Sequence, residues 1–548
     1  MVAQRAIRSQ EEESDGDLQT EIVMITITDN EGATKARYEI ERATFDGAEW
    51  ELLAGDAPVA TLTRGEFEFS VEWGKLIFAW WGENVSQSWR VVAYEIDRAE
   101  LRLQATRGMA REMAVLTLRD PAKWREIREF ENLPLNERRK LYAKSLAQLI
   151  ANHFGDAKTQ RVTVGADRPR SVAGRYARLQ IKLGGETALA IGVSEAESQA
   201  EVDGVIAAGL VWLAGFNEER DEKQRAQRLW FCLPRGRSQT AIERLTLIDV
   251  SHPGARIECF EIDERNEEMT GVRPATQDEL LNAHPREVIW PGASAADERW
   301  RERILALAPD LIEARRRAAH DGESFAINGL EFARVSGGEN QKVKFGVAGL
   351  RSEDEAAGHA TLTESNFSEL EKLVREIARY RSADSPDRRH PFYRLRAEAW
   401  LESLLRRNLR GFDATLDDRF AYSQIPTWRG DERSVIDLLT VNHEGRLVVT
   451  EIKAAEDGQL PMQGLDYWLR VEQARLRGEF KKRGLFAGVE IADQPPLLYL
   501  VAPRLRFHRT FAIVARCIAP QIEAYQIGIN ANWREGARAH TRERINQR

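Results

Sequence analysis

Two acids and one lysine lie close together in two apolar segments of the C-terminal half. Asp437 lies in the run Ser-Val-Ile-Asp-Leu-Leu at 434–439, and Glu451 and Lys453 end the run Leu-Val-Val-Thr-Glu-Ile-Lys at 447–453. Hard divalent cations prefer carboxylate oxygens as ligands, and a neighbouring lysine can orient a water molecule or stabilise negative charge. Together these residue types fit the metal-dependent hydrolysis of a phosphodiester bond.

The local pattern predicts how the three residues meet. Both runs are typical of strands, and the four residues 442–445 (Asn-His-Glu-Gly) between them are typical of a hairpin turn. Residues i and i+2 of a strand share a face, so Glu451 and Lys453 are expected to point the same way. Asp437 is expected to reach that face from the adjacent strand.

Other features in the same order strengthen this interpretation. A helix is expected at 397–405 (Ala-Glu-Ala-Trp-Leu-Glu-Ser-Leu-Leu), and a Gln-x-x-x-Tyr spacing follows the lysine strand at Gln463 and Tyr467. With Ile436-Asp437 and Glu451-Ile452-Lys453, the segment from about 390 to 530 resembles the restriction-endonuclease-like PD-(D/E)XK nuclease superfamily. It carries Ile-Asp where the motif name has Pro-Asp.

The resemblance implies a role for each acid. Asp437 and Glu451 would bind Mg²⁺ or Mn²⁺, and Lys453 would be the catalytic amine, with a pKa lowered by nearby cations. An acid from the first helix, Glu402 or Glu398, would complete the cluster. The two lie four residues apart and can share one helical face. Glu402 is preferred because it follows Leu401 in the amphipathic pattern, so the expected catalytic set is Asp437, Glu451, Lys453 and Glu402.

Substrate contacts are expected from polar and basic residues around this set. Gln463 and Tyr467 are four residues apart and would contact substrate or the groups behind the metal ligands. Residues 386–410 hold seven arginines against three acids, and Arg406 and Arg407 are the candidates for binding phosphate. A solvated charged surface explains such a run equally well. The expected partner is nucleic acid, with DNA preferred over RNA.

Composition sets the frame for this site. A chain of 548 residues predicts several domains, and 43% hydrophobic with 30% charged residues fits a globular protein. No apolar run of membrane-spanning length and no secretory signal is visible, and three scattered cysteines suit a reducing compartment, so the expected location is cytoplasmic. The net charge of −8 leaves room for a local basic groove. Neither a phosphate-binding loop nor a Cys/His metal cluster is present.

The expected fold class is multidomain α+β or α/β. The predicted parts are a disordered tail (1–20), a β-rich sandwich or barrel (21–119), an α/β domain (120–293), a helical and β connector (294–385), a restriction-endonuclease-like α/β/α domain (386–530) and a polar, arginine-containing tail or frayed helix (531–548). Charged helices are predicted in the connector at 298–319 and 366–381. A homo-oligomer or a regulatory partner is expected to use residues 21–385.

The middle of the chain repeats the layout of the C-terminal segment. Strands are predicted at 176–183 and 187–193 around a Gly-Gly turn, and further strands at 229–234 and 256–260 alternate with helices. Ala190-Ile191-Gly192 is expected at the position of Glu451-Ile452-Lys453. The hypothesis is a duplicated α/β domain whose first copy has lost its metal ligands.

The sequence therefore predicts a Mg²⁺-dependent nuclease, a hydrolase that binds and cuts nucleic acid, in a repair, restriction or phage-defence setting. The alternative is a catalytically inactive nucleic-acid-binding or scaffold protein that retains the fold. A third interpretation is a ligand-gated effector whose middle domain senses a small molecule.

Overall fold

The computed structural model describes most of the chain. The described residues are 24–43, 48–55, 57–82, 85–97, 99–107, 112–165, 172–249, 254–283, 288–290, 298–317, 322–335, 342–348, 360–429 and 432–547. The tail expected at 1–20 lies outside them. The chain divides into two compact units, Met1–Arg138 and Arg139–Arg548, each of which is considered by itself.

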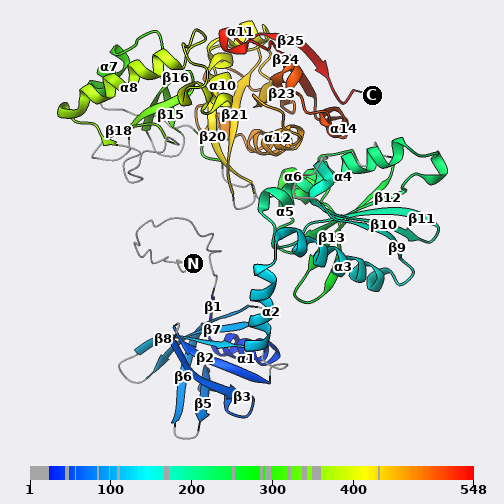
Figure 1. The fold of residues 1–548 in the computed structure, drawn as a ribbon. Helices are drawn as coiled ribbons and strands as arrows, with labels where there is room; N and C mark the ends of the chain where they lie inside the picture. Colours follow the sequence, from blue (N-terminus) through cyan, green and yellow to red (C-terminus); the bar gives the residue numbers. More distant parts are fainter. Residues whose placement is uncertain are drawn as a thin grey trace. The chain divides into compact units, whose positions relative to one another are not determined.

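An antiparallel sheet with a helix on one face makes up the N-terminal unit (Figure 1). Its strands, in sheet order, are β3 (Ala57–Thr63), β2 (Glu49–Ala54), β8 (Glu112–Arg119), β7 (Glu100–Arg107), β6 (Val85–Ile96), β5 (Lys75–Gly82) and β4 (Phe67–Glu72), with β1 (Ile25–Thr26) pairing β6. Helix α1 (Asn30–Ala43), which the sequence pattern did not predict, buries Ala33, Ala36 and Ile40 against this sheet. The predicted sandwich or barrel is therefore one sheet packed on a helix.

The tryptophan-rich strand of this unit serves mainly as core. Trp80 on β5 is 5% exposed, whereas the next residue, Trp81, is 38% exposed. Alternate residues of a strand face opposite sides, so only one of the two rings can enter the core. Helix α2 (Pro121–Asn132) follows the sheet.

A six-stranded mixed sheet forms the middle domain, defined here as residues 139–283. Helix α3 (Leu135–Phe154) leads into it. The strands, in sheet order, are β9 (Lys158–Thr163), β10 (Ala177–Leu183), β11 (Glu186–Gly192), β12 (Arg228–Pro234), β13 (Arg256–Asp263) and β14 (Glu268–Val272). The connections are η1 (Val172–Arg175), α4 (Gln199–Glu218), η2 (Glu222–Gln224), α5 (Gln239–Thr246) and, after the sheet, α6 (Gln277–Asn282). Leu189 and Ile191 face α4, whereas Ala188 and Ala190 face α3.

The segment predicted as a connector is a small α+β module with a core of its own. Its five-stranded antiparallel sheet is β15 (Ile312–Arg317), β16 (Gly322–Ile327), β17 (Leu330–Val335), β18 (Val343–Phe345) and β19 (Ala360–Thr361). Helix α7 (Glu298–Ala306) precedes the sheet, and η4 (Glu364–Asn366) and α8 (Phe367–Tyr380) follow it. The helix predicted at 298–319 ends early because residues 312–317 pair with β16 instead.

The C-terminal domain, defined as residues 391–547, holds the second six-stranded sheet. Its strands, in sheet order, are β20 (Tyr422–Arg429), β21 (Glu432–Val441), β22 (Leu447–Ile452), β23 (Leu497–Pro503), β24 (Ala524–Ile529) and β25 (Ala539–Arg544). Its helices are α9 (Pro391–Arg394), α10 (Ala397–Arg407), α11 (Leu409–Phe412), α12 (Leu460–Leu476), α13 (Glu479–Lys482), η5 (Arg504–Arg506), α14 (Phe511–Ala515) and η6 (Trp533–Glu535). Figure 1 shows α10 and α12 beside this sheet.

The expectation of a polar tail or frayed helix after residue 530 is wrong. Residues 539–544 form the edge strand β25, which pairs antiparallel with β24. Trp533 is buried beside Trp400, and Asn546 is buried at the end of the chain. Charged side chains on an edge strand hide its identity from a hydrophobicity pattern.

The two six-stranded sheets have the same strand order and the same strand directions. In each, the first three strands are antiparallel, the third, fourth and fifth are parallel, and the last is antiparallel. Helices α4 and α12 occupy the same crossover, after the third strand, and α5 and α14 occupy the next.

The middle and C-terminal domains pack through these crossover helices. Helix α14 packs against α4, α12 packs against α5 and α6, and one apolar core runs continuously through all of them. At its centre Arg244 on α5 makes two bonds to the Asp466 carboxylate on α12, with Nε–Oδ1 2.9 Å and Nη2–Oδ2 2.6 Å. Both side chains are at most 9% exposed.

Helix α4 is long and rich in apolar residues. Its length and composition would allow it to cross a membrane, yet 61% of its apolar window is buried within the protein. The burial follows from its position, because α4 packs on its own sheet and on α14.

Asn546 provides a test of the C-terminal end of the fold. Its Nδ2 donates to the carbonyl oxygens of Ile518, Ala519 and Ile522, at 3.3, 3.0 and 2.7 Å. We expect Asn546→Ala to lower the free energy of unfolding by about 1–3 kcal/mol, because buried carbonyls lose their donor. Thermal unfolding followed by tryptophan fluorescence measures this, with the exposed neighbour substitution Gln547→Ala as control. Equal midpoints for both variants would contradict the described end of the chain.

Candidate functional site

The hairpin of β21 and β22 positions the three residues that the sequence singled out. Its turn includes Gly445 with φ +80°, where an added Cβ would lie 2.1 Å from the carbonyl oxygen of Glu490. Leu438 pairs with Thr450, which fixes the register and places Asp437 next to Glu451. The predicted hairpin, its turn and its register agree with these elements.

Asp437, Glu451 and Lys453 meet at the end of β22. The Lys453 Nζ lies 2.8 Å from Glu451 Oε1, and the backbone N–H of Ile452 donates to Asp437 Oδ2 at 2.9 Å. Glu451 is 1% exposed, and the Lys453 side chain is 13% exposed. The three charges therefore interact with little screening by water.

Burial dominates the acid–base properties of both carboxyl groups. It raises the pKa of Asp437 to about 6, although Lys453 and the Ile452 N–H act in the opposite direction. It also raises the pKa of Glu451 well above the usual value, and the Asp437 carboxylate adds to that effect. A buried and a half-buried acid side by side are thus incompletely compensated by one lysine.

The electrostatics of Lys453 are set by the neighbouring acids, and the expectation of a pKa lowered by nearby cations stays a prediction. Burial alone would lower its pKa, but the carboxylates of Glu451 and Glu398 and the hydrogen bond to Glu451 outweigh burial. The pKa is therefore raised rather than lowered. The amine is held as a cation and a donor.

One carboxylate oxygen in this group has no donor directed at it. Among the described residues, Glu451 Oε2 is buried without a hydrogen-bond partner. A buried, unsatisfied carboxylate oxygen is costly unless a cation, a water molecule or a proton shared with Asp437 reaches it. Over the same residues, no group of three or more His, Cys, Asp and Glu side chains is placed to hold a metal ion, so the two acids form the central pair.

Between the two candidate glutamates of the first helix, the structure brings Glu398 toward the site. The Glu398 carboxylate contributes to raising the pKa of both Asp437 and Lys453. Glu402, the preferred choice, is 1% exposed and its Oε2 lies 2.9 Å from Arg315 Nη1, with Arg406 3.6 Å from Oε1. The preference for Glu402 is corrected, because its contacts belong to an ion-pair cluster with the 298–380 module.

Tyr467 also lies beside the acids. It is 6% exposed, its hydroxyl is 2.7 Å from Ser434 Oγ, and burial and the Glu451 carboxylate both raise its pKa. Ser434 opens the apolar run quoted above, but nothing in the sequence pairs it with the tyrosine. Gln463, one helical turn earlier on α12, has a buried Oε1 without a partner in the described part of the chain. Its predicted contact with substrate stays a prediction.

The two arginines predicted to bind phosphate have partners within the chain. Arg406 pairs with Glu313 and Glu402, and Arg407 pairs with Glu313 at 3.4 Å and with the amide of Asn328. Glu313 and Asn328 belong to the 298–380 module. These guanidinium groups therefore join two parts of the protein, and their assignment to substrate is not carried forward.

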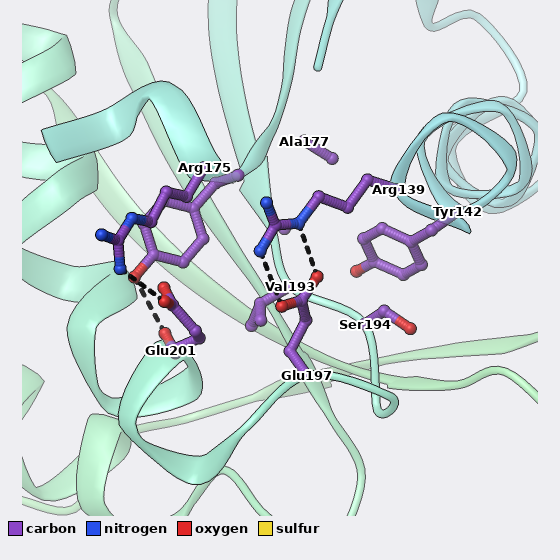
Figure 2. A pocket seen from close by; sticks show the side chains of 10 residues that line it. Arg139, Tyr142, Arg175, Ala177, Val193, Ser194, Glu197 and Glu201 are labelled. Atoms are coloured by element: carbon purple, nitrogen blue, oxygen red, sulfur yellow. Dashed lines mark hydrogen bonds and ion pairs between the residues drawn. The ribbon is translucent and has the colours of Figure 1, made fainter. Parts of the chain in front are cut away.

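A polar pocket lies in the middle domain, at the end of β11 (Figure 2). Arg139 makes two bonds to Glu197, with Nε–Oε1 2.7 Å and Nη2–Oε2 2.8 Å. The hydroxyl of Tyr142, a residue 5% exposed, is buried without a partner among the described residues. The lining residues are Arg139, Tyr142, Arg175, Tyr176, Ala177, Gly192, Val193, Ser194, Glu197 and Glu201.

Comparison with known proteins gives no indication of function, so the functional argument rests on the geometry of the site. No protein-family model matches the chain, and no curated protein is significantly similar to it.

Exchanging the glutamates of α10 one at a time separates their roles. We expect Glu402→Gln to lower the free energy of unfolding by roughly 2 kcal/mol, because Arg315 and Arg406 lose a charged partner in a buried cluster. Glu398 is exposed, so Glu398→Gln is expected to change stability by no more than about 0.5 kcal/mol. Thermal unfolding at neutral pH measures both. An equal loss in the two variants would contradict the assignment of Glu402 to a structural cluster.

Proposed function

We propose that the C-terminal domain hydrolyses phosphodiester bonds of nucleic acid, preferentially DNA, in a reaction that depends on Mg²⁺ or Mn²⁺. The observation that carries this proposal is the group at the end of β22. There a buried and a half-buried carboxyl group lie together beside one lysine ammonium, and one oxygen of the buried group has no donor among the described residues. The resemblance of the 390–530 segment to PD-(D/E)XK nucleases supports the same chemistry.

The donor set fits a hard divalent cation. Asp437 and Glu451 offer oxygen ligands, and Glu398 adds negative charge from the first turn of α10. Asp437 and Glu451 would hold the ion. When bound, the cation neutralises charge on the phosphate and lowers the pKa of a water molecule.

The remaining residues would position the substrate and the attacking water. Lys453 is held as a cation 2.8 Å from Glu451, so its ammonium can donate to a non-bridging phosphate oxygen or orient the water. Tyr467 is held by its contact with Ser434, near the Glu451 carboxylate. The unpartnered Oε1 of Gln463 can accept a hydrogen bond from the substrate or from a water.

An inactive scaffold explains these features less well. Glu402 is also a buried acid with a raised pKa, but two arginines pair with it, whereas Asp437 and Glu451 share one lysine. An acid pair compensated so incompletely destabilises a fold unless it serves a ligand. Activity at a site commonly requires such locally unfavourable groups.

Cleavage assays with matched variants test the proposal. We expect metal-dependent cutting by the full chain, and a loss of at least about 100-fold in Glu451→Gln, Asp437→Asn and Lys453→Ala, because the two acids would hold the cation and the lysine would stabilise charge on the phosphate. The substrates are supercoiled, linear duplex and single-stranded DNA and RNA, each with Mg²⁺, Mn²⁺ or EDTA.

Glu444→Gln is the control, since Glu444 is an exposed acid in the turn at the opposite end of the same hairpin. Its rate should stay within about twofold of the wild-type rate. Cutting that persists in Glu451→Gln, or that is unaffected by EDTA, would show that this group does not carry the activity.

A further inference from the structure

The middle domain can be aligned with the C-terminal domain residue by residue. Pro234 ends β12 and Pro503 ends β23, the corresponding strands of the two sheets. Two residues before each proline, a carbonyl oxygen accepts the bond that closes the parallel pair. The donor is the N–H of Val193 in the middle domain (3.2 Å) and the N–H of Lys453 in the C-terminal domain (2.9 Å).

This register makes Val193 the counterpart of Lys453, and Ile191 the counterpart of Glu451. The counterparts lie one residue later than Ala190 and Gly192, which the sequence pattern suggested. Leu179 pairs with Ala190 as Leu438 pairs with Thr450, so the counterpart of Asp437 is Arg178.

At the equivalent positions of the middle domain, the charges of the C-terminal candidate site are thus absent or reversed. Two aliphatic side chains replace an acid and a lysine, and a cation replaces the other acid. The Arg178 guanidinium is half-buried over the ring of Trp212, at 5.9 Å from the centroid. It would repel a divalent cation.

In the pocket beside Val193, an arginine also neutralises the acid. Figure 2 shows Arg139 and Glu197 facing each other, and the guanidinium donates one hydrogen bond to each carboxylate oxygen. The two side chains are 11% and 9% exposed. A paired carboxylate of this kind leaves no uncompensated negative charge for a metal ion.

The two domains also contact each other reciprocally. Helix α4 packs on α14 while its counterpart α12 packs on α5, the counterpart of α14. Between them, Ile248 and Ile518 form an antiparallel bridge, and each follows the end of its own second crossover helix. The Asp249 N–H donates to the Cys517 carbonyl and the Ala519 N–H donates to the Leu247 carbonyl, at 2.7 and 3.0 Å. Such reciprocity is the signature of an approximate two-fold axis.

We infer that the middle domain takes the place that a second subunit would occupy in a dimer, and that one chain therefore cuts one strand of a duplex per encounter. The inference rests on the proposed function. The middle domain occupies the surface of α12 and α14 through which a second nuclease domain would pack, and it carries Arg178, Ile191 and Val193 in place of the reactive residues. One chain therefore brings one competent site to a duplex that has two strands.

The step itself is an ordinary hydrolysis. The oxygen of a water molecule forms a bond to phosphorus, one phosphorus–oxygen ester bond breaks, and the leaving oxygen takes up a proton. One strand then ends in a phosphate monoester and a hydroxyl group, and the opposite strand stays intact.

Supercoiled plasmid with Mg²⁺ provides the test, because nicked and linear products separate on a gel. With the full chain below the plasmid concentration, we expect the nicked circle to accumulate at least about tenfold over linear DNA in the early time course. The initial rate should rise in direct proportion to protein concentration, and sedimentation should give the mass of one chain. Glu451→Gln should abolish nicking, whereas Glu201→Gln, which changes an acid lining the middle-domain pocket, should leave the rate within about twofold.

Several outcomes would overturn the inference. Linear DNA that forms from the start without a nicked intermediate, or a rate that rises with the square of the protein concentration, would show two cooperating sites. Cleavage confined to single-stranded nucleic acid would also overturn it while leaving the proposed function in place. A failure to cut any substrate would remove the proposed function and this inference together.

Discussion

The structure of the second compact unit depends on helix α12 being buried on both sides. Fourteen of its 17 residues are buried. On the inner side Gly464 lies so close to Leu498 and Leu500 that a Cβ would come within 2.5 Å of the Leu500 side chain. On the outer side the helix carries charges, and two of them find partners in the middle domain, whereas Glu472 and Arg475 pair with each other. Asp466 binds Arg244, and Arg470 lies 2.5 Å from Glu243. A helix held in this way has little freedom to shift on its sheet.

This constraint reaches the candidate site through Tyr467. The tyrosine lies on the same turn as Asp466 and contacts Ser434 at the start of the strand that carries Asp437. Helix α12 therefore contributes neighbouring residues both to the domain interface and to the candidate site. Removing one partner of a buried ion pair typically costs about 3–5 kcal/mol, so Arg244 and Asp466 restrict which changes the interface can accept.

Local sequence patterns predicted the elements that depend on neighbours along the chain. The β21–β22 hairpin and strands β10 to β12 were predicted close to their observed bounds, because alternation and turn residues are local signals. Strands β15 and β25 were missed because their charged residues hide the apolar alternation that marks a strand, although each pairs with the strand next to it along the chain. Glu402 was misjudged for a different reason. Its sequence resembles that of a site acid, and only Arg315, from another part of the chain, assigns it to a structural cluster.

The comparison of the two six-stranded sheets separates what the fold requires from what the chemistry requires. Both sheets keep the same order, directions and crossover helices, although Ile191 and Val193 stand at the positions of Glu451 and Lys453. The scaffold therefore does not need charges at the end of its third strand, where aliphatic residues are easier to bury. Asp437 and Glu451, unlike the buried acids Asp466 and Glu402 that pair with arginines, therefore carry an electrostatic cost that the fold itself does not require. A cation that reaches Glu451 Oε2 would offset that cost, which is why the argument for function rests on these carboxylates rather than on the fold.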